Sequence, residues 1–175
     1  MKKFILILLF FTISISAQDS SIITKECSVF SFKDSLTLPG STMEIFDAVT
    51  GDISEWWDHS FYENPYKLYI EPKAGGGFYE VFNKEGDGAL HATVIYSDRG
   101  KQIRFDGPLG LSGKALQLVC TYNFYAMEND STKLVLSVNG SGEIDKGIPA
   151  IIKNVWFHFL HEQFEPYILA GKHKK

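Results

Sequence analysis

Apolar and polar residues alternate along most of the chain, in short segments separated by glycine-rich or polar turns. The first segment covers residues 29–38, and its even-numbered apolar residues share one face of a predicted strand. Six further segments of this kind follow between residues 66 and 144. Because the turns between them are short, consecutive strands should pair antiparallel and form a meander.

Three other segments have helical spacing. Residues 41–50 start with a capping serine or threonine and carry apolar residues three and four apart, and residues 52–59 predict a second short helix capped by Asp52. A long helix is predicted for residues 147–172, where Pro149 fits the first turn and Pro166 should kink or end it. Its apolar face contains Ile148, Ile151, Ile152, Val155, Trp156 and Phe159.

This element order predicts an α+β fold. A curved antiparallel sheet of about seven strands should wrap around the long C-terminal helix, with two short helices after the first strand. A straight helix cannot touch a strongly bent sheet along its whole length. We therefore expect a cavity between sheet and helix.

The first 17 residues have the layout of a secretory signal peptide: two lysines, an apolar run and then small residues. Residues 18–26 are predicted to be a loose lead-in, and residues 27–172 a single domain. The apolar run is shorter than the roughly 20 residues that span a bilayer. The mature protein should therefore be periplasmic or secreted, without a stable membrane span, although an uncleaved anchor is an alternative.

Composition narrows the choice of partners. A formal net charge of -4 argues against a nucleic-acid partner, and 45% hydrophobic residues argue against a disordered chain. Exported proteins often contain disulfides. Strand alternation, however, turns Cys27 outward and Cys120 inward, which disfavours a bond between them.

The motifs "IFDAVTGDISEWWD", "AGGGFYE" and "FDGPLGLSGKAL", with Thr132 before the last strand, resemble the START-like or SRPBCC superfamily. The similarity extends from Cys27 to Ala170, and the third motif matches only in part. The resemblance implies the helix-grip fold and the polyketide cyclase-like or heat-shock-ATPase-activator-like bacterial subgroup. It also implies a class of ligand, but no particular reaction.

Glu80 and His91 are the main candidate site residues. If residues 84–87 form a four-residue loop, Glu80 lies opposite His91 on the face that carries Phe78 and Phe82. A carboxylate and an imidazole held in an apolar wall can act as acid and base, or give a ligand its polar contacts. The pair could instead be a buried structural contact, or both side chains could face solvent.

Other candidates surround the expected cavity. Tyr122 should point inward, where its hydroxyl would need a partner. On the long helix, Trp156 and Phe159 belong to the apolar face. Glu162 falls on that face and Gln163 beside it, so either could reach a ligand, unless this end of the helix is wet.

No metal or cofactor is predicted. His158 and Glu162 are four residues apart, as are His161 and Glu165, but the order H-E-x-x-H is absent and the spacing supplies no ligand from another element. Nucleophile and phosphate-loop motifs are also missing from the sequence.

Three functions are compatible with these patterns. The first is an exported protein that holds an apolar or amphipathic molecule in its cavity. The second is a cyclase- or dehydratase-type enzyme that uses Glu80 and His91. The third is a partner-binding protein or homodimer, because Phe157 and Phe164 lie nearly opposite the helix's main apolar face.

Overall fold

The structure is a computed structural model that describes Ile22, Thr24 and residues 26–174. The predicted signal peptide, residues 1–17, lies outside the described residues, as does most of the lead-in. Eight strands form one antiparallel sheet in the order β1-β8-β7-β6-β5-β4-β3-β2. The strands are β1 (Ser28–Pro39), β2 (Gly51–Asp52), β3 (Lys67–Ile70), β4 (Gly77–Val81), β5 (Gly88–Asp98), β6 (Gln102–Gly107), β7 (Leu116–Met127) and β8 (Ser131–Gly142).

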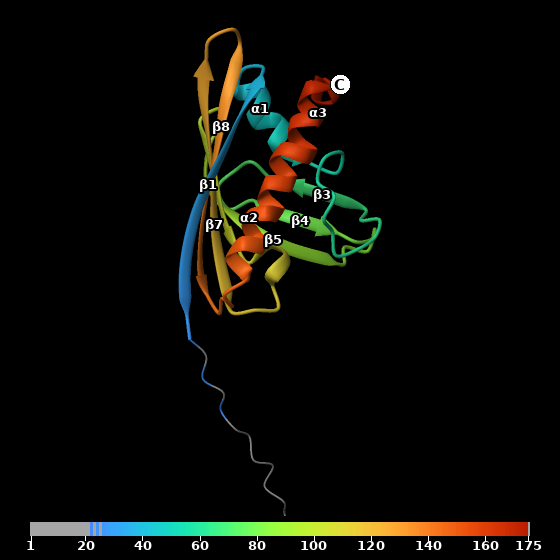
Figure 1. Cartoon of the computed structure of the whole chain (residues 1–175). Helices are drawn as coiled ribbons and strands as arrows, with labels where there is room; N and C mark the ends of the chain where they lie inside the picture. Colours follow the sequence, from blue (N-terminus) through green and yellow to red (C-terminus); the bar gives the residue numbers. More distant parts are fainter. Residues whose placement is uncertain (1–21, 23, 25, 175) are drawn as a thin grey trace, which may run out of the picture.

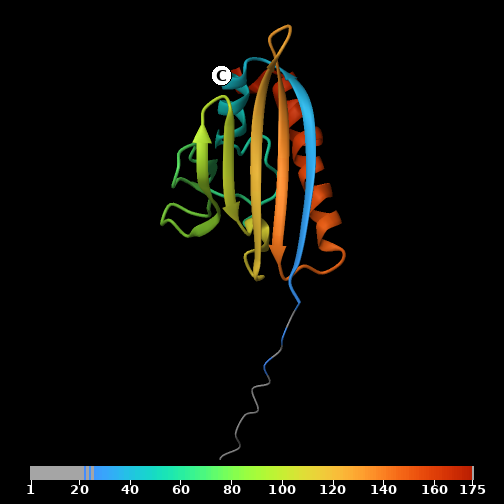
Figure 2. The same cartoon turned by 90° about the vertical axis from the view of Figure 1, so that its left-hand side faces the viewer.

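This sheet confirms the predicted α+β class, and the six strands after residue 66 form the expected meander. The chain curves so that the C-terminal helix crosses one face of the sheet (Figure 1). Figure 2 shows the opposite face toward the viewer, with the helices behind it. The arrangement is compatible with a helix-grip fold.

One of the two predicted short helices forms. Helix α1 (Thr42–Val49) begins after Ser41, whose hydroxyl accepts a hydrogen bond from the Glu44 N–H at 3.3 Å. Phe46 of α1 packs on Phe124 of β7, with ring centroids 5.4 Å apart. This contact fixes α1 against one end of the sheet.

The helix predicted for residues 52–59 is wrong. Asp52 ends the two-residue strand β2, and its carboxylate accepts hydrogen bonds from the N–H and hydroxyl of Ser54, at 3.0 and 2.6 Å. The N–H groups of Trp56 and Trp57 then donate to the Ile53 carbonyl, at 3.2 and 2.9 Å, which closes a single turn. Beyond it the chain is irregular, because Trp56 and Trp57 pack into the interior with their rings 71° apart. The sequence pattern assigns these apolar residues to a helix face, although they belong to a loop.

The long C-terminal helix changes its winding. It consists of α2 (Ile148–Phe157), the π-helical segment η2 (His158–Phe164) and α3 (Glu165–Leu169). A π-helix has more residues per turn than an α-helix. Pro166 lies in the first turn of α3, where a missing N–H is tolerated, so the helix continues past it.

The wider winding changes which residues face the sheet. The buried side chains recur every four residues, at Ile152, Trp156, Leu160, Phe164 and Ile168, with Phe159 beside them. Phe164 is therefore 0% exposed and packs on Trp56, whereas Glu162 is exposed. The outward position predicted for Phe164 is wrong, and Phe157 alone of that pair remains exposed. Phe157 and Phe164 therefore do not share the exposed face on which the predicted dimer depended.

Two other predictions concern single residues. Cys27 is exposed, Cys120 is buried, and both are free thiols, as the alternation indicated. Thr132 is buried, and its hydroxyl donates to the Gly40 carbonyl at 2.8 Å, linking β8 to the turn before α1. Within the described residues, no helix is both long and apolar enough to cross a membrane.

Candidate functional site

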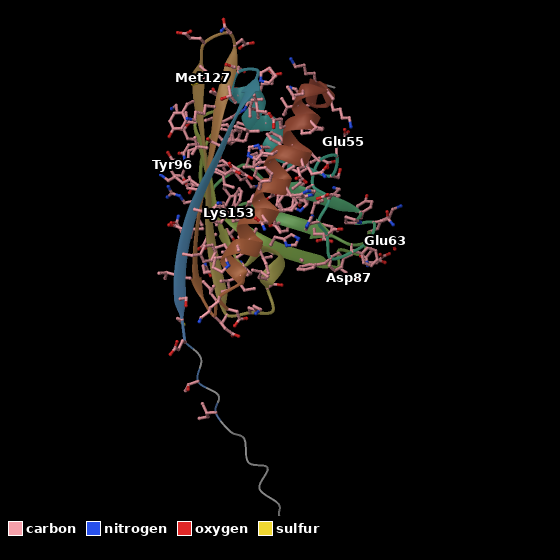
Figure 3. The ribbon with its side chains drawn as sticks, in the orientation of Figure 1. Glu55, Glu63, Asp87, Tyr96, Met127 and Lys153 are labelled. Carbon is pink, nitrogen blue, oxygen red and sulfur yellow. The ribbon has the colours of Figure 1, made fainter. Side chains whose placement is uncertain are left out.

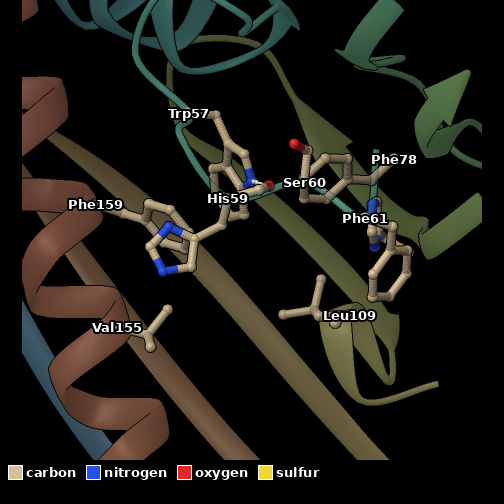
Figure 4. Close-up of a pocket in the computed structure, with 10 residues that line it drawn as sticks. Trp57, His59, Ser60, Phe61, Phe78, Leu109, Val155 and Phe159 are labelled. Carbon is tan, nitrogen blue, oxygen red and sulfur yellow. Dashed lines mark hydrogen bonds between the residues drawn. The ribbon is translucent and has the colours of Figure 1, made fainter. Parts of the chain in front are cut away.

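A pocket of about 250 Å³ lies between the C-terminal helix, the sheet and two loops. Figure 4 shows Val155 and Phe159 of the helix on one side and Leu109 and Phe61 on the other. The pocket is lined by Trp57, His59, Ser60, Phe61, Phe78, His91, Leu109, Gly110, Val155 and Phe159. Most of these side chains are apolar or aromatic, so the predicted cavity between sheet and helix exists.

Stacked aromatic rings form one wall of the pocket. The rings of Trp57 and Phe159 are nearly parallel, 3.7 Å apart between centroids, and Phe78 meets Trp57 edge-on at 5.0 Å. Trp156 packs behind both Trp57 and Phe159, at 5.9 Å from each ring. Trp156 therefore supports this wall, and the structure does not place it in the pocket lining.

The loop after β6 closes another side. Leu109 belongs to the single 3₁₀ turn η1 (Leu109–Leu111) and has a φ of 52°, in the left-handed region that non-glycine residues rarely adopt. Such a conformation costs about 1–3 kcal/mol and persists only where the surroundings impose it. It directs an apolar side chain to the pocket, beside Gly110.

Glu80 is 0% exposed, and three groups donate hydrogen bonds to its carboxylate. The N–H of Phe61 donates to Oε2 at 3.0 Å, the N–H of Tyr62 to Oε1 at 2.8 Å, and Nε2 of His91 lies 2.9 Å from Oε2. A carboxylate accepts and does not donate, so Nε2 of His91 carries the proton of that bond. Glu80 thereby ties the loop of Phe61 and Tyr62 to the sheet.

Glu80 and His91 meet as predicted, but not through the predicted register. The four-residue loop covers residues 83–86 and not 84–87: the N–H of Phe82 donates to the Asp87 carbonyl at 2.7 Å, and Glu80 pairs with Ala89. A β-bulge between Phe78 and Tyr79 then inserts one extra residue on β5, so that both His91 and Ala92 are buried. The bulge turns His91 inward and brings its ring to Glu80.

His91 is the residue of this pair that lines the pocket. Its ring lies 5.1 Å from that of Phe61 and 5.0 Å from that of Phe78. Among the described residues, no hydrogen bond uses its Nδ1 atom. A neutral imidazole that donates from Nε2 has an acceptor at Nδ1. Nδ1 of His91 is therefore an acceptor without a partner among the described residues, on a ring whose orientation Glu80 sets.

The remaining predicted residues lie elsewhere. Phe82 stacks on Tyr62 at 5.4 Å, outside the lining. Glu63, which follows Tyr62, and Asp87, which precedes β5, lie on the same side of the molecule (Figure 3). Tyr122 points inward and is 1% exposed, but its hydroxyl has no partner among the described residues. Burial raises the pKa of this phenol well above its usual value.

Glu162 and Gln163 belong to a second group of polar residues, which we name the Asp58 cluster. It contains Asp58, His59, His158, Glu162 and Gln163. Nδ1 of His59 lies 2.8 Å from Oδ1 of Asp58, and Nε2 of His158 lies 2.7 Å from Oδ2. Nδ1 of His158 meets Glu162 at 2.7 Å, and the Gln163 amide donates to Oδ2 of Asp58 at 3.0 Å.

Charge in the Asp58 cluster shifts two pKa values. Hydrogen bonds to Glu162 and then to Asp58 raise the pKa of His158. Partial burial opposes ionisation of Asp58, but bonds from His59 and His158 outweigh it and hold its pKa below the usual value. His161, by contrast, pairs with Asp34 of β1 and with Glu165, so the two histidines of the helix serve different sites.

Sequence reasoning missed Trp57, His59, Ser60 and Phe61 as pocket residues, because it assigned Trp57 and His59 to a helix and gave the next two residues no element. It also missed Leu109 as an individual residue. For the changed winding of the C-terminal helix, by contrast, the sequence contains a signal. Apolar residues recur there at intervals of four, which indicates a helix wound more loosely than an α-helix; they are Ile152, Trp156, Leu160, Phe164 and Ile168.

Comparisons with known proteins identify the fold but no family. No protein-family model matches the chain, and no curated protein matches it significantly. A protein of unknown function from Staphylococcus aureus has a similar structure, with a TM-score of 0.63 and 11% identity over 86% of this chain and 99% of its own. An uncharacterised protein from Rhizobium leguminosarum has a TM-score of 0.58 and 15% identity, over 82% and 99%.

A protein of the dynemicin biosynthetic locus is also similar, with a TM-score of 0.56 and 16% identity, over 81% of this chain and 48% of that protein. Identities this low establish a shared fold and nothing about activity. The functional argument therefore rests on the pocket and the Asp58 cluster.

Proposed function

We propose that the protein binds a small, mostly apolar molecule that carries one hydrogen-bond donor. The observation that supports this most directly is His91, which lines an apolar pocket while Glu80 holds its ring in place and its Nδ1 has no hydrogen bond among the described residues. Small-molecule sites combine apolar walls with a few placed polar groups. The proposed ligand would lie between the Trp57–Phe159 wall and Leu109.

The volume limits the size of this ligand. An apolar cavity of about 150 Å³ is large enough for benzene, so about 250 Å³ suits a one- or two-ring molecule or a short branched chain. A full-length fatty acid would need the pocket to widen. The favoured class is therefore a compact aromatic or alicyclic alcohol, amide or acid.

A pair of probes of equal shape tests the proposal. Naphthol and methylnaphthalene differ in whether a hydroxyl or a methyl group is present, and binding of both can be followed by quenching of tryptophan fluorescence. One neutral hydrogen bond contributes about 0.5–1.5 kcal/mol, so naphthol should bind about 2–10-fold more tightly. His91→Phe should remove this preference. Equal binding of the two probes to the wild-type protein would refute the proposed role of His91.

A variant that fills the pocket tests whether the probes bind there. Leu109→Trp should block both probes, whereas Ile151→Trp, on the exposed side of α2, should leave binding unchanged. Native mass spectrometry of gently purified protein provides an independent measurement. If neither probe binds and no molecule co-purifies, the binding function is excluded.

We further infer membership in the START-like or SRPBCC superfamily and export from the cytoplasm. The order of elements and the partly matched motifs support the first inference, and residues 1–17 support the second. N-terminal sequencing of protein secreted by an expression host tests export. A mature chain that retains residue 1 would contradict cleavage.

The enzyme hypothesis receives support from one observation. In the Glu80–His91 pair, the imidazole borders the pocket and the carboxylate lies behind it, as in sites where a carboxylate orients a histidine base. His91 would then transfer the proton and Glu80 would be a positioning residue. Wild-type protein should accelerate exchange of the α-protons of cyclohexanone in deuterated water, and His91→Phe should not. Equal exchange rates would exclude this role.

A further inference from the structure

The Asp58 cluster brings together three potential metal ligands from two parts of the chain. One carboxylate oxygen of Asp58, one ring nitrogen of His59 and one of His158 all lie within 4.8 Å of one another. Asp58 and His59 come from the loop after β2, and His158 is the first residue of the π-helical segment. Two imidazoles with one carboxylate are a ligand set that suits zinc.

The surroundings of His158 match those of a metal-bound histidine. Such a histidine usually donates its second ring N–H to a carboxylate, which fixes the tautomer and aims the other nitrogen at the metal. Nδ1 of His158 meets Oε2 of Glu162 at 2.7 Å, which leaves Nε2 directed toward Asp58. Glu162 is therefore placed as the orienting partner of this ligand.

The π-helical winding contributes to this geometry. Residues four and five positions after His158 both reach its ring: Glu162 at Nδ1, and Gln163 at 3.4 Å from Nε2. In a π-helix, residues five apart lie above one another, and such segments often occur at functional sites. In an α-helix the neighbours of His158 would be the residues three and four positions after it, and Gln163 would not be one of them.

The loop side is also held in position. The indole N–H of Trp57 donates to the carbonyl of His59 at 2.7 Å, and the ring of Trp57 stacks on Phe159 of the same helix. The backbone that carries Asp58 and His59 is thereby fixed against the helix that carries His158. The two negative charges of Asp58 and Glu162 would balance those of a divalent cation.

We propose that Asp58, His59 and His158 bind a zinc-type divalent cation. The cation would replace the protons that now join these side chains. Zinc–ligand bonds of about 2.1 Å imply ligand atoms about 3.4 Å apart, whereas the present contacts are 2.7 and 2.8 Å. The side chains of Asp58 and His59, which are 42% and 52% exposed, can make this adjustment by small rotations. Because His59 also lines the pocket, a fourth ligand position is accessible to water or to a pocket occupant.

Isothermal titration of metal-free protein with zinc chloride tests this site, using a chain without a histidine tag. Wild-type protein should bind one zinc ion with micromolar or tighter affinity. His59→Ala and His158→Ala should each weaken binding by more than about 100-fold, and Glu162→Gln by about 10–100-fold. Cobalt(II) added instead should give the visible absorption of a tetrahedral site.

The neighbouring histidine provides the matched control. His161 also faces two carboxylates, from Asp34 and Glu165, but no second histidine joins it among the described residues. His161→Ala should leave zinc affinity unchanged. The proposal is overturned if the wild-type protein binds no zinc. It is also overturned if His161→Ala weakens binding as much as His158→Ala does, while circular dichroism shows that both variants are folded.

Discussion

Replacing Glu80 by glutamine should destabilise the protein strongly, although the two side chains have almost the same shape. The Glu80 carboxylate is fully buried and accepts from Phe61 N–H, Tyr62 N–H and the His91 ring. Glutamine has one acceptor oxygen and one NH₂ group. Whichever way the amide is turned, its NH₂ faces a group that donates.

The magnitude follows from counting these bonds. In the better orientation, the amide oxygen takes the place of Oε2 and keeps the bonds from Phe61 and His91, but the N–H of Tyr62 loses its acceptor. A buried unsatisfied donor costs about 1–3 kcal/mol. The two remaining bonds lose their ionic partner and with it about half of their strength, roughly 1 kcal/mol each. The total loss is about 3–5 kcal/mol.

Thermal unfolding measures this loss. For a domain of this size, about 2–4 °C of melting temperature corresponds to each kcal/mol, so Glu80→Gln should melt at least about 6 °C below wild type. Glu85→Gln, in the exposed loop between β4 and β5, is the control and should stay within about 0.5 kcal/mol. Hydrogen exchange adds local detail, because the amides of Phe61 and Tyr62 should become less protected in Glu80→Gln alone.

Two results would refute this reasoning. One is a melting temperature of Glu80→Gln equal to that of wild type. The other is equally fast exchange of the Phe61 and Tyr62 amides in both proteins. Either result would mean that Glu80 does not anchor the loop, and would favour a carboxylate that acts on a ligand instead.

Four further predictions follow from other contacts. Tyr122→Phe should be neutral or stabilising by up to about 1 kcal/mol in denaturant unfolding, because it removes a buried hydroxyl without a partner. Gly107→Ala should destabilise by about 1–3 kcal/mol, because its new Cβ would lie 2.6 Å from backbone atoms of the bulge at His91. Iodoacetamide should label Cys27 in the native protein but Cys120 only after unfolding, since burial raises the pKa of the Cys120 thiol. Bonds from His173 and then Lys174 lower the pKa of Glu44, so the stabilisation that Glu44→Gln removes, up to about 1 kcal/mol, should be present at neutral pH. It should vanish as the pH falls below the ordinary value of 4.5 and through the lowered one.

Each of these predictions has an outcome that contradicts it. Loss of stability in Tyr122→Phe would reveal a partner for the hydroxyl, and an unchanged Gly107→Ala would mean that the bulge can move aside. Rapid native labelling of Cys120 would show that the core opens. A stability difference between wild type and Glu44→Gln that persists in acid would assign the effect of Glu44 to packing.

The sheet and its covering helix could be predicted because the apolar residues of each strand or helix recur with one dominant spacing. Alternation from β3 to β8 identified six strands and their antiparallel order, and short turns excluded crossovers. The same alternation placed Cys27 and Cys120 on opposite faces. These inferences need only the local pattern of apolar residues.

The site was harder to predict, because it depends on departures from regular periods. The hairpin loop begins one residue earlier than predicted, so the residues paired with β4 were wrong, and the contact with Glu80 was correct because the bulge turns His91 inward. Trp57 imitated a helix face while belonging to a loop, whose path depends on hydrogen bonds to Glu80 across the fold. Contacts of this range leave no local pattern in the sequence.

The π-helical segment has a consequence for how the length of this chain can vary. Residues 158–164 contain what amounts to one surplus residue relative to an α-helix. Winding the same residues as an ordinary α-helix would rotate everything that follows. Glu162 would turn toward the sheet and Phe164 toward water. The wider winding thus accommodates the surplus residue, and a chain one residue shorter in this segment could place the same aromatic side chain against Trp56 with an ordinary α-helix.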